Sequence, residues 1–508
     1  MPAQDELFQL IKSLTSSEKR YFKVNASKGG DAKSNYLQLF EAMDAQNDEY
    51  DEQKLKAKHG KKAFVKYLSA EKKHLREQIM KQMRLFHSSR TVDNKINELL
   101  QDEIFYREKG LNNLREKALL KAKELATNAE RFHLLKEILS RQTTFVIEFE
   151  KKQLAEPVIQ LINEQKQLFI TQESVLELQS KNRELFSILR SGADMQDAAV
   201  KNRVEMLFME VERYRTRIGE SYILQCHFER ACSNYHHLQR NWKESFEHTK
   251  NEYEVYQKAK HLITEDPMFY KFCLANIMAR AQSAGENDWF TKSLEEMKAL
   301  PTSSFNEEGE VFQNVYFQEH LFYINNGEFE KAEALVSIIE MGLVKYEAKI
   351  NQARKLAFQF NIMVMYFIIH EFKKALKWTE PLLSDNSEIK QQQKFVTILL
   401  LPLIHFELGH TDLVETFTRS AYRYLQKKKR LHEFERLVLN YLKNMPLSAD
   451  QIEFKTQLQE FHDKLEKLTN DRTIKMTIGM EEMGLWAQSH ISGKQMQLIL
   501  REKSNSQD

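Results

Sequence analysis

Glycine, proline and cysteine are all scarce in this chain. Its 508 residues include 14 glycines and 7 prolines, whereas average proteins contain about 7% and about 5% of these residues. Because both residues mark turns and interrupt regular structure, their scarcity predicts few breaks between long helices. The three cysteines, Cys226, Cys232 and Cys273, include no CxxC pair. They therefore provide no disulfide framework and suit a reducing compartment.

Long apolar runs and targeting segments are also missing. The longest apolar runs, 358–369 and 395–408, are shorter than the roughly 18–20 residues that a membrane-spanning helix needs. Residues 1–12 carry acidic side chains and lack the basic and apolar stretches of a secretory signal. We therefore expect a cytoplasmic protein without a membrane partner.

Recognisable motifs for catalysis and cofactor binding are absent as well. No glycine-rich dinucleotide motif occurs, and Leu55 stands where a phosphate loop ending at Gly60 would need a glycine. The two His-Glu pairs fail as zinc motifs because Lys374 and Arg436 occupy the positions of the second histidine. We predict no enzyme activity and no cofactor. An enzyme whose catalytic groups converge from distant repeats stays an alternative.

One segment contains several residue types that bind metals. It holds Cys226, His227, Cys232, His236 and His237. Four ligands from one helix cannot easily surround a tetrahedral ion, so a second segment would have to contribute. Small buried cysteines and histidines at the edge of a core are the more common arrangement. We therefore predict no metal site.

Charged and apolar residues are both abundant, and their pattern favours helices. Charged residues make up 29% of the chain and hydrophobic residues 42%, with 32 phenylalanines. This composition is typical of long helices with solvated outer faces, and it argues against a disordered chain. No alternating apolar pattern is long enough to indicate a sheet. The predicted fold class is all-α.

A short turn recurs between apolar helical segments in the second half of the chain. Its clearest copy lies at 326–332, and residues 370–375 repeat the aromatic residue and the alanine 43 residues later. A weaker copy lies at 408–414, 39 residues further on, and residues 241–245 form a plausible earlier one. Such copies are typical of helical-hairpin repeats, whose proteins usually bind partners rather than catalyse reactions.

The turn at 326–332 resembles the turn within a tetratricopeptide repeat, a pair of antiparallel helices. In that family a glycine precedes an aromatic residue by two positions and a small residue by five, as Gly327, Phe329 and Ala332 do here. The spacing of about 40 residues exceeds the usual 34. The resemblance implies a curved array of helix pairs, a tetratricopeptide-like solenoid, over residues 220–445. Larger residues replace the family's small residue seven positions before the glycine, namely His320, Met363 and Pro402.

The resemblance also implies a partner-binding wall, because ligands of this family lie against the first helix of each pair. The residues that it places on this inner wall are Asn314, Phe317, Leu321, Asn325, Phe360, Val364 and Phe367, followed by Val396, Leu399 and Leu403. Most of them are apolar. The wall therefore either receives an apolar segment of a partner or is filled by the chain's own helices. Periodic apolar residues usually belong to a core, and both alternatives stay open here.

Residues 1–92 are predicted to form a separate helical domain. Thr15 and Glu18 match a capping box that would open its second helix. The segment 17–22, SEKRYF, resembles a group of uncharacterised bacterial helical proteins. We expect three further parts: long helices joining the array at 93–219, the repeats at 220–445, and capping helices with a polar tail at 446–508.

A dense basic segment ends this N-terminal domain. Residues 54–90 contain 12 lysines and arginines against two glutamates, a net charge of +10 (12 − 2) in a chain whose total is +2. In one helix over 61–87, the apolar residues would cluster on one side, with a basic stripe roughly opposite. We predict that the stripe binds nucleic-acid phosphates or an acidic protein surface. The alternative is a solvated face, partly neutralised by residues 48–52. The stripe comprises Lys62, Lys66, Lys73, Arg76 and Arg84.

Together these patterns predict a non-catalytic scaffold or adaptor that binds a protein or peptide through a helical-repeat surface. The alternative is a regulator, in which the basic N-terminal domain contacts nucleic acid while the array senses a peptide or protein. Neither interpretation determines the oligomeric state.

Overall fold

The structure of the chain is a computed structural model. It describes residues 5–28, 34–46, 50–60, 62–87, 91–149, 155–191, 195, 197–265, 267–302, 304–385, 391–445, 451–470 and 479–505. Helices make up 86% of the structure. Within the described residues there are 26 α-helices and no strand. The prediction of an all-α fold is therefore confirmed.

The chain divides into two compact units, which are described separately. Unit 1 comprises residues 1–191 and 204–270, and unit 2 comprises residues 192–203 and 271–508. The finer boundaries predicted at residues 92, 219 and 445 stay predictions.

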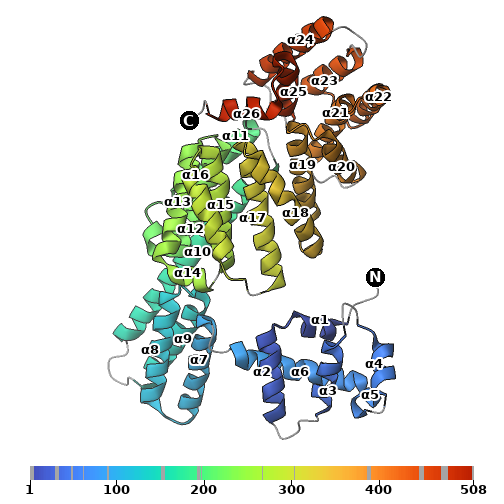
Figure 1. The fold of residues 1–508 in the computed structure, drawn as a ribbon. Coiled ribbons are helices and arrows are strands. Elements are labelled where there is room, and N and C mark those ends of the chain that lie inside the picture. Colours follow the sequence, from blue (N-terminus) through green and yellow to red (C-terminus); the bar gives the residue numbers. More distant parts are fainter. Residues whose placement is uncertain are drawn as a thin grey trace. The chain divides into compact units, whose positions relative to one another are not determined.

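Six helices at the start of unit 1 enclose a core of their own. In this core Phe22, Phe40 and Phe64 are fully buried. The predicted capping box is confirmed, because the Thr15 N–H donates to Glu18 Oε2 at 2.7 Å and the Glu18 N–H donates to Thr15 Oγ1 at 3.3 Å. The six helices are α1 Glu6–Ser13, α2 Ser16–Lys28, α3 Asn35–Asp44, α4 Glu52–His59, α5 Ala63–Lys66 and α6 Leu68–His87 (Figure 1).

The single helix predicted over 61–87 is wrong, because the structure breaks it at Tyr67. Residue 61 lies outside the described residues, α5 ends at Lys66, and α6 begins at Leu68. Tyr67 itself has φ −119° and ψ 37°, which is not helical. The physical reason is packing: α5 lies against α3 as well as α6, and Phe64 is fully buried in the shared core. Tertiary burial here outweighs the local tendency to continue the helix.

The rest of unit 1 consists of longer helices. Its buried charges are paired: Arg115 Nε donates to Glu103 Oε1 at 2.7 Å, and Arg141 Nη1 donates to Glu103 Oε2 at 2.8 Å. Two of the helices, α11 and α15, contribute residues to both units. The helices are α7 Val92–Glu108, α8 Asn112–Asn128, α9 Phe132–Phe149, α10 Ala155–Ser191, α11 Ala198–Glu212, α12 Tyr222–Leu238, α13 Trp242–Lys258, α14 Lys260–Glu265 and α15 Pro267–Ala284.

Unit 2 is a succession of helix pairs in which each helix packs on the next. Helices α17 to α22 form three antiparallel pairs, visible in Figure 1 from yellow to orange. One large apolar core continues from Ile324 to Ile499. The helices that follow α15 are α16 Asn287–Ala299, α17 Phe305–Asn325, α18 Phe329–Lys345, α19 Gln352–Ile368, α20 Phe372–Ser384, α21 Gln391–Glu407, α22 Thr411–Lys427, α23 Glu433–Asn444, α24 Gln451–Asn470, α25 Met480–Ser492 and α26 Met496–Asn505.

The recurring turn has one backbone geometry throughout the chain. In each copy a residue with positive φ follows the end of a helix, and the next N–H donates to a carbonyl five residues back at 2.8–2.9 Å. This pattern is the Schellman motif, which satisfies carbonyl groups at a helix C-terminus. Eight copies occur in the described residues, with positive φ at Gly110, Glu130, Arg240, Gly285, Gly327, His370, Gly409 and Lys429.

Four of these turns were predicted from the sequence and four were not. The predicted copies at 241–245, 326–332, 370–375 and 408–414 all contain or follow such a turn. The copy at 370–375 has His370 at φ +62° in place of glycine, a conformation that costs a side chain about 1 kcal/mol. A turn that tolerates glutamate, arginine, histidine and lysine leaves only a weak sequence signal.

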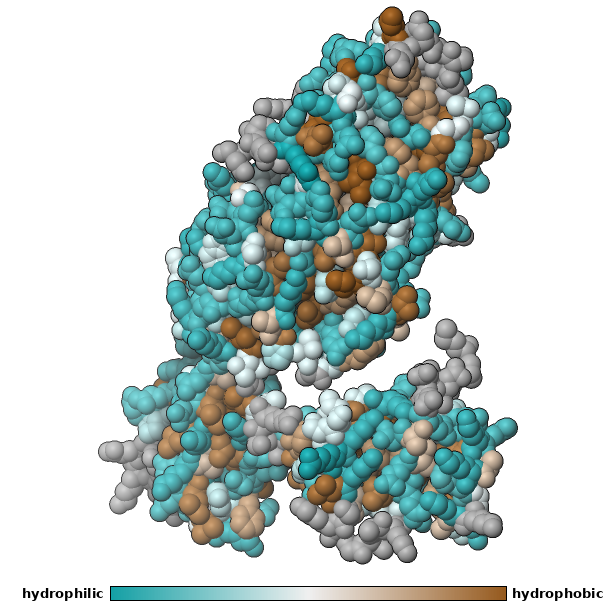
Figure 2. All heavy atoms as spheres, in the orientation of Figure 1, coloured by the Kyte–Doolittle hydropathy of each residue, from teal (hydrophilic) through white to brown (hydrophobic). Residues whose placement is uncertain are grey.

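The next feature is the length and hydropathy of the helices, together with the distribution of apolar side chains on the surface. No helix in the part of the chain that the structure describes is long and apolar enough to cross a membrane. On the face drawn in Figure 2, hydrophilic side chains cover most of the described surface, and apolar side chains form separate patches among them.

Candidate partner-binding surfaces

Much of the predicted inner wall lies in the core of unit 2. Phe360, Val364 and Phe367 are at most 6% exposed, because α19 is buried on almost every side. Val396, Leu399 and Leu403 on α21 are equally buried. On α17, Asn314, Phe317 and Leu321 are half-buried, and Asn325 is exposed. Binding of a partner at these positions stays a prediction.

The C-terminal helices fill part of this wall. Helix α25 packs against α19. Trp486 on α25 and Met496 on α26 belong to the same apolar core as Phe360 and Val364. Gly479, just before α25, lies so close to α21 that a Cβ there would be 2.8 Å from Val396 Cγ1. Helices α25 and α26 therefore cover part of the wall that α19 and α21 form.

Polar contacts tie α26 to two of the recurring turns. Arg501 Nε donates to the Gly327 carbonyl at 2.7 Å, and its Nη2 lies 2.7 Å from Glu330 Oε2. The N–H of Met496 donates to Nε2 of His370 at 3.3 Å. The residues with positive φ in two successive turns therefore both contact α26. Long-range bonds of this kind fix the C-terminal helix against specific turns.

A buried carboxylate ties α25 to the end of α21. Trp486 Nε1 and His490 Nε2 each lie 2.6 Å from Glu407 Oε1. Burial alone would raise the pKa of Glu407, but the hydrogen bonds and charge of His490, with the Trp486 bond, keep that pKa below its usual value. The ionised carboxylate is thus the favoured partner for both donors.

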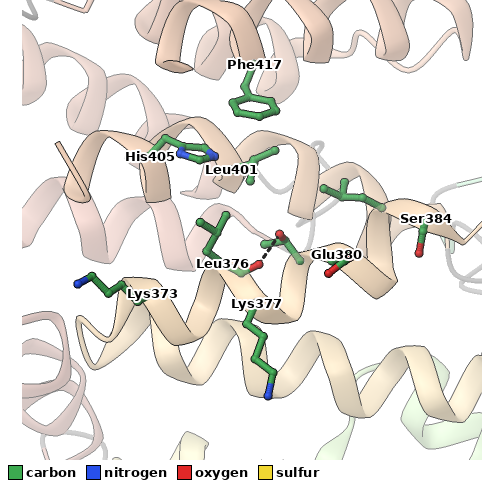
Figure 3. Close-up of a pocket in the computed structure, with 10 residues that line it drawn as sticks. Lys373, Leu376, Lys377, Glu380, Ser384, Leu401, His405 and Phe417 are labelled. Carbon is green, nitrogen blue, oxygen red and sulfur yellow. Dashed lines mark hydrogen bonds between the residues drawn. The ribbon is translucent and has the colours of Figure 1, made fainter. Parts of the chain in front are cut away.

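An open groove lies between α20, α21 and α22. Its volume is about 740 Å³. Leu376, Leu401 and the rings of His405 and Phe417 point toward one another across it (Figure 3). The His405 and Phe417 rings are stacked, with centroids 4.7 Å apart and planes at 7°. The remaining lining residues are Lys373, Lys377, Thr379, Glu380, Leu383 and Ser384.

The groove has an apolar floor and a charged rim. Leu401 and His405 are at most 7% exposed. Burial, and the neighbouring His410, lower the pKa of His405, so its ring is neutral at pH 7 and packs as an aromatic surface. Lys373 and Lys377 are exposed at one end of α20, and Lys377 Nζ lies 3.5 Å from Glu340 Oε1.

No pattern in the sequence predicted this groove, for a physical reason. Its lining comes from three helices and includes no residue of the predicted inner wall. Leu376 and Phe417 lie on the second helices of their pairs, which the family resemblance assigns to the outside. In the sequence, the one pattern that could indicate this groove is the pair Lys373 and Lys377 next to apolar residues at helical spacing.

The basic stripe of the N-terminal helices is exposed. Lys62, Lys66, Lys73, Arg76 and Arg84 are all exposed. Among the acidic residues nearby, Glu52 pairs with Lys56 and Lys72, and Asp5 pairs with Lys72. Within the stripe, Arg76 Nη1 lies 3.3 Å from Glu6 Oε2. Because of the break at Tyr67, only Lys73, Arg76 and Arg84 share one helix face, whereas Lys62 precedes α5 and Lys66 is its last residue.

The segment rich in cysteine and histidine forms no metal centre within the residues that the structure describes. No group of three or more potential ligands occurs there. Cys226, Cys232 and Cys273 are buried and form no disulfide bond, and burial raises the pKa of the Cys226 and Cys232 thiols. These residues act as small apolar groups.

The comparisons with known proteins give no family for the chain. No family model, curated protein or solved structure matches it. The interpretation of these surfaces therefore depends on the residues and their geometry.

Proposed function

We propose that this protein is a non-catalytic adaptor, a tetratricopeptide-like array of helix pairs that binds a segment of a partner protein. The observation that carries the proposal is the open, apolar-floored groove between α20, α21 and α22. The repeated Schellman turns and successive helix contacts support the array. The C-terminal helices occupy part of the inner wall, so the outer groove is the better candidate for a partner.

The shape of the groove favours an amphipathic helix as occupant. Its lining extends along α20 from Lys373 to Ser384, which corresponds to about 17 Å at the rise of an α-helix. That length matches about three turns of a bound helix, with apolar anchors at positions i, i+3 or i+4, and i+7. Lys373, at the end of this lining, favours a carboxylate at the matching end of the peptide. The proposed partner segment is therefore an acidic amphipathic helix.

A peptide-display selection on the purified protein tests this proposal. We expect enriched peptides to share the i, i+3/i+4, i+7 apolar spacing with an acidic residue at one end. A synthetic peptide of this kind should lose at least about tenfold in affinity, or about 1.4 kcal/mol, when Leu376→Glu and Lys373→Glu are combined. Lys373 is exposed, whereas Leu376 is half-buried and packs against the core of unit 2, so circular dichroism should first show that the variant is folded. Fluorescence anisotropy measures the affinity.

The matched control is Lys443→Glu, a charge reversal at an exposed lysine on α23 that lies outside the groove. It should leave the affinity unchanged. Failure to enrich any peptide family, or equal binding to the groove variant, would contradict the proposal.

A second candidate function, binding of nucleic acid, is favoured by the exposure of the basic stripe. Lys73, Arg76 and Arg84 share one face of α6, and Tyr67 beside Lys66 is 60% exposed. Cations beside an exposed aromatic ring suit a polyanion whose bases can stack. This candidate corresponds to the regulator alternative.

Charge reversal on α6 tests the second candidate. Wild-type protein should bind a labelled DNA duplex at low salt, and the logarithm of the affinity should fall with log salt at a slope of roughly −2 to −3, as expected for about three phosphate contacts. Lys73→Glu with Arg84→Glu should abolish this binding. The control is Lys54→Glu with Lys58→Glu, which reverses exposed lysines on α4. If the wild type does not bind DNA at low salt, or if both variants lose the same affinity, the stripe is ruled out as a nucleic-acid binding site.

A further inference from the structure

A second cavity, independent of the adaptor groove, lies within unit 1 beside α12. Its volume is about 90 Å³. A single water needs roughly 10–15 Å³ of such volume, so the cavity holds about six to nine waters, or an organic molecule with a similar number of heavy atoms. Its lining combines cationic and apolar side chains, among them Arg131, His227, Arg230, Ile223, Leu262 and Phe269.

His227 is the polar group that most clearly lacks a partner here. The residue is 8% exposed, and its Nδ1 has no hydrogen-bond partner among the described residues. Burial, with repulsion from Arg230 and Arg183, lowers the pKa of His227 to about 3, so the imidazole is neutral. A buried polar atom without a hydrogen-bond partner destabilises the folded protein. His227 is one of the residues that line the cavity, so a ligand there would contact this neutral ring.

The two arginines that line the cavity are each ion-paired with a carboxylate of the chain. Arg230 Nε donates to Glu252 Oε1 at 3.0 Å, and Arg131 Nε lies 2.7 Å from Asp93 Oδ1. Neither carboxylate lines the cavity itself. A guanidinium has five N–H donors in a planar fork, so it can contact a carboxylate of the chain and one of a ligand together.

The apolar part of the lining suits a hydrocarbon body. Phe269 and Leu262 come from α15 and α14, and Ile223 from the first turn of α12. The Arg230 guanidinium carbon lies 5.9 Å from the centre of the Phe269 ring. A small carboxylate with an apolar body would satisfy the cationic and the apolar lining at once. We infer that this cavity is a binding site for a small monocarboxylate whose body is apolar, with His227 and the two arginines receiving its carboxylate.

Titration calorimetry with benzoate and hexanoate on the full-length protein tests this inference. Both probes should bind saturably to one site per chain. Neutral benzamide, which keeps the shape of benzoate without its charge, should bind at least about tenfold more weakly, since hydrogen bonds to a charged acceptor are stronger than those to a neutral one. Equal binding of benzamide, or no saturable binding of either carboxylate, overturns the inference.

Two variants locate the site. His227→Gln should weaken benzoate binding at least tenfold. Ile223→Phe should abolish it by filling the cavity while retaining every polar group, so it remains informative if His227→Gln does not fold. The control is His133→Gln, at an exposed histidine on α9, which should bind like the wild type. Benzoate binding that survives Ile223→Phe places the ligand elsewhere and overturns the assignment.

Discussion

Gly342→Ala should destabilise the protein by at least about 2 kcal/mol, the upper part of the range for overpacking in a close-packed core. Gly342 lies in α18, and a Cβ at this position would be 2.0 Å from Cε2 and Cζ of Phe312 on α17. Phe312 cannot easily retreat, because its ring also contacts Tyr316, Tyr346 and Phe358. Denaturant unfolding followed by circular dichroism measures the loss.

Gly484→Ala is the matched control, with an effect of opposite sign. Gly484 also lies within a helix, α25, but the nearest atom to its added Cβ is Leu465 Cδ2 at 3.8 Å, an ordinary contact distance. Alanine should therefore stabilise this helix by about 0.5–1 kcal/mol through its higher helix propensity. Phe312→Leu should recover part of the Gly342→Ala loss in a double-mutant cycle. If the two glycine variants change the free energy of unfolding equally, α17 and α18 do not make the close contact described here.

Trp486→Ala should cost about 3–5 kcal/mol, the range for truncation of a fully buried large aromatic residue. Trp486 is 1% exposed, its ring lies against Phe406, Tyr441 and His490, and its Nε1 donates to Glu407. Its removal leaves a cavity between α25 and α21. Chemical denaturation measures the total loss, and hydrogen exchange should show faster exchange first in α25 and α26.

Trp242→Ala is the control for this prediction. Trp242 is 37% exposed at the start of α13, so its truncation should cost no more than about 1 kcal/mol. Equal costs at the two tryptophans would mean that α25 is not an integral part of the core. In that case the inner wall would be free for a partner.

Local signals in the sequence predicted much of the secondary structure. The capping box of Thr15 and Glu18 was found because its two hydrogen bonds join residues three apart. The turn around Gly327 was found because glycine tolerates its φ of +70°. The turn at Glu130 was missed because a glutamate at φ +51° gives no such signal.

The tetratricopeptide resemblance predicted helix pairs, and unit 2 contains helix pairs, whereas the register that it implies for a binding site stays a prediction. The large residue at His320, in place of the family's small one, is fully buried, and both of its ring nitrogens lack partners among the described residues. The helices therefore pack around a bulky side chain where that family has a close approach. The groove that we propose as the binding surface combines Leu376 and Phe417, from second helices of their pairs, with Leu401 and His405 from α21, a first helix.

By itself, the amino-acid sequence determined the all-α class, the helix pairs and the exposed cations, because each depends on residues a few positions apart. Only the tertiary structure decided what covers the inner wall and where a groove stays open. The contacts of Arg501 with Gly327 and of Met496 with His370 join residues 174 and 126 positions apart. Contacts over such separations follow from the packing of whole helices, which no local pattern specifies.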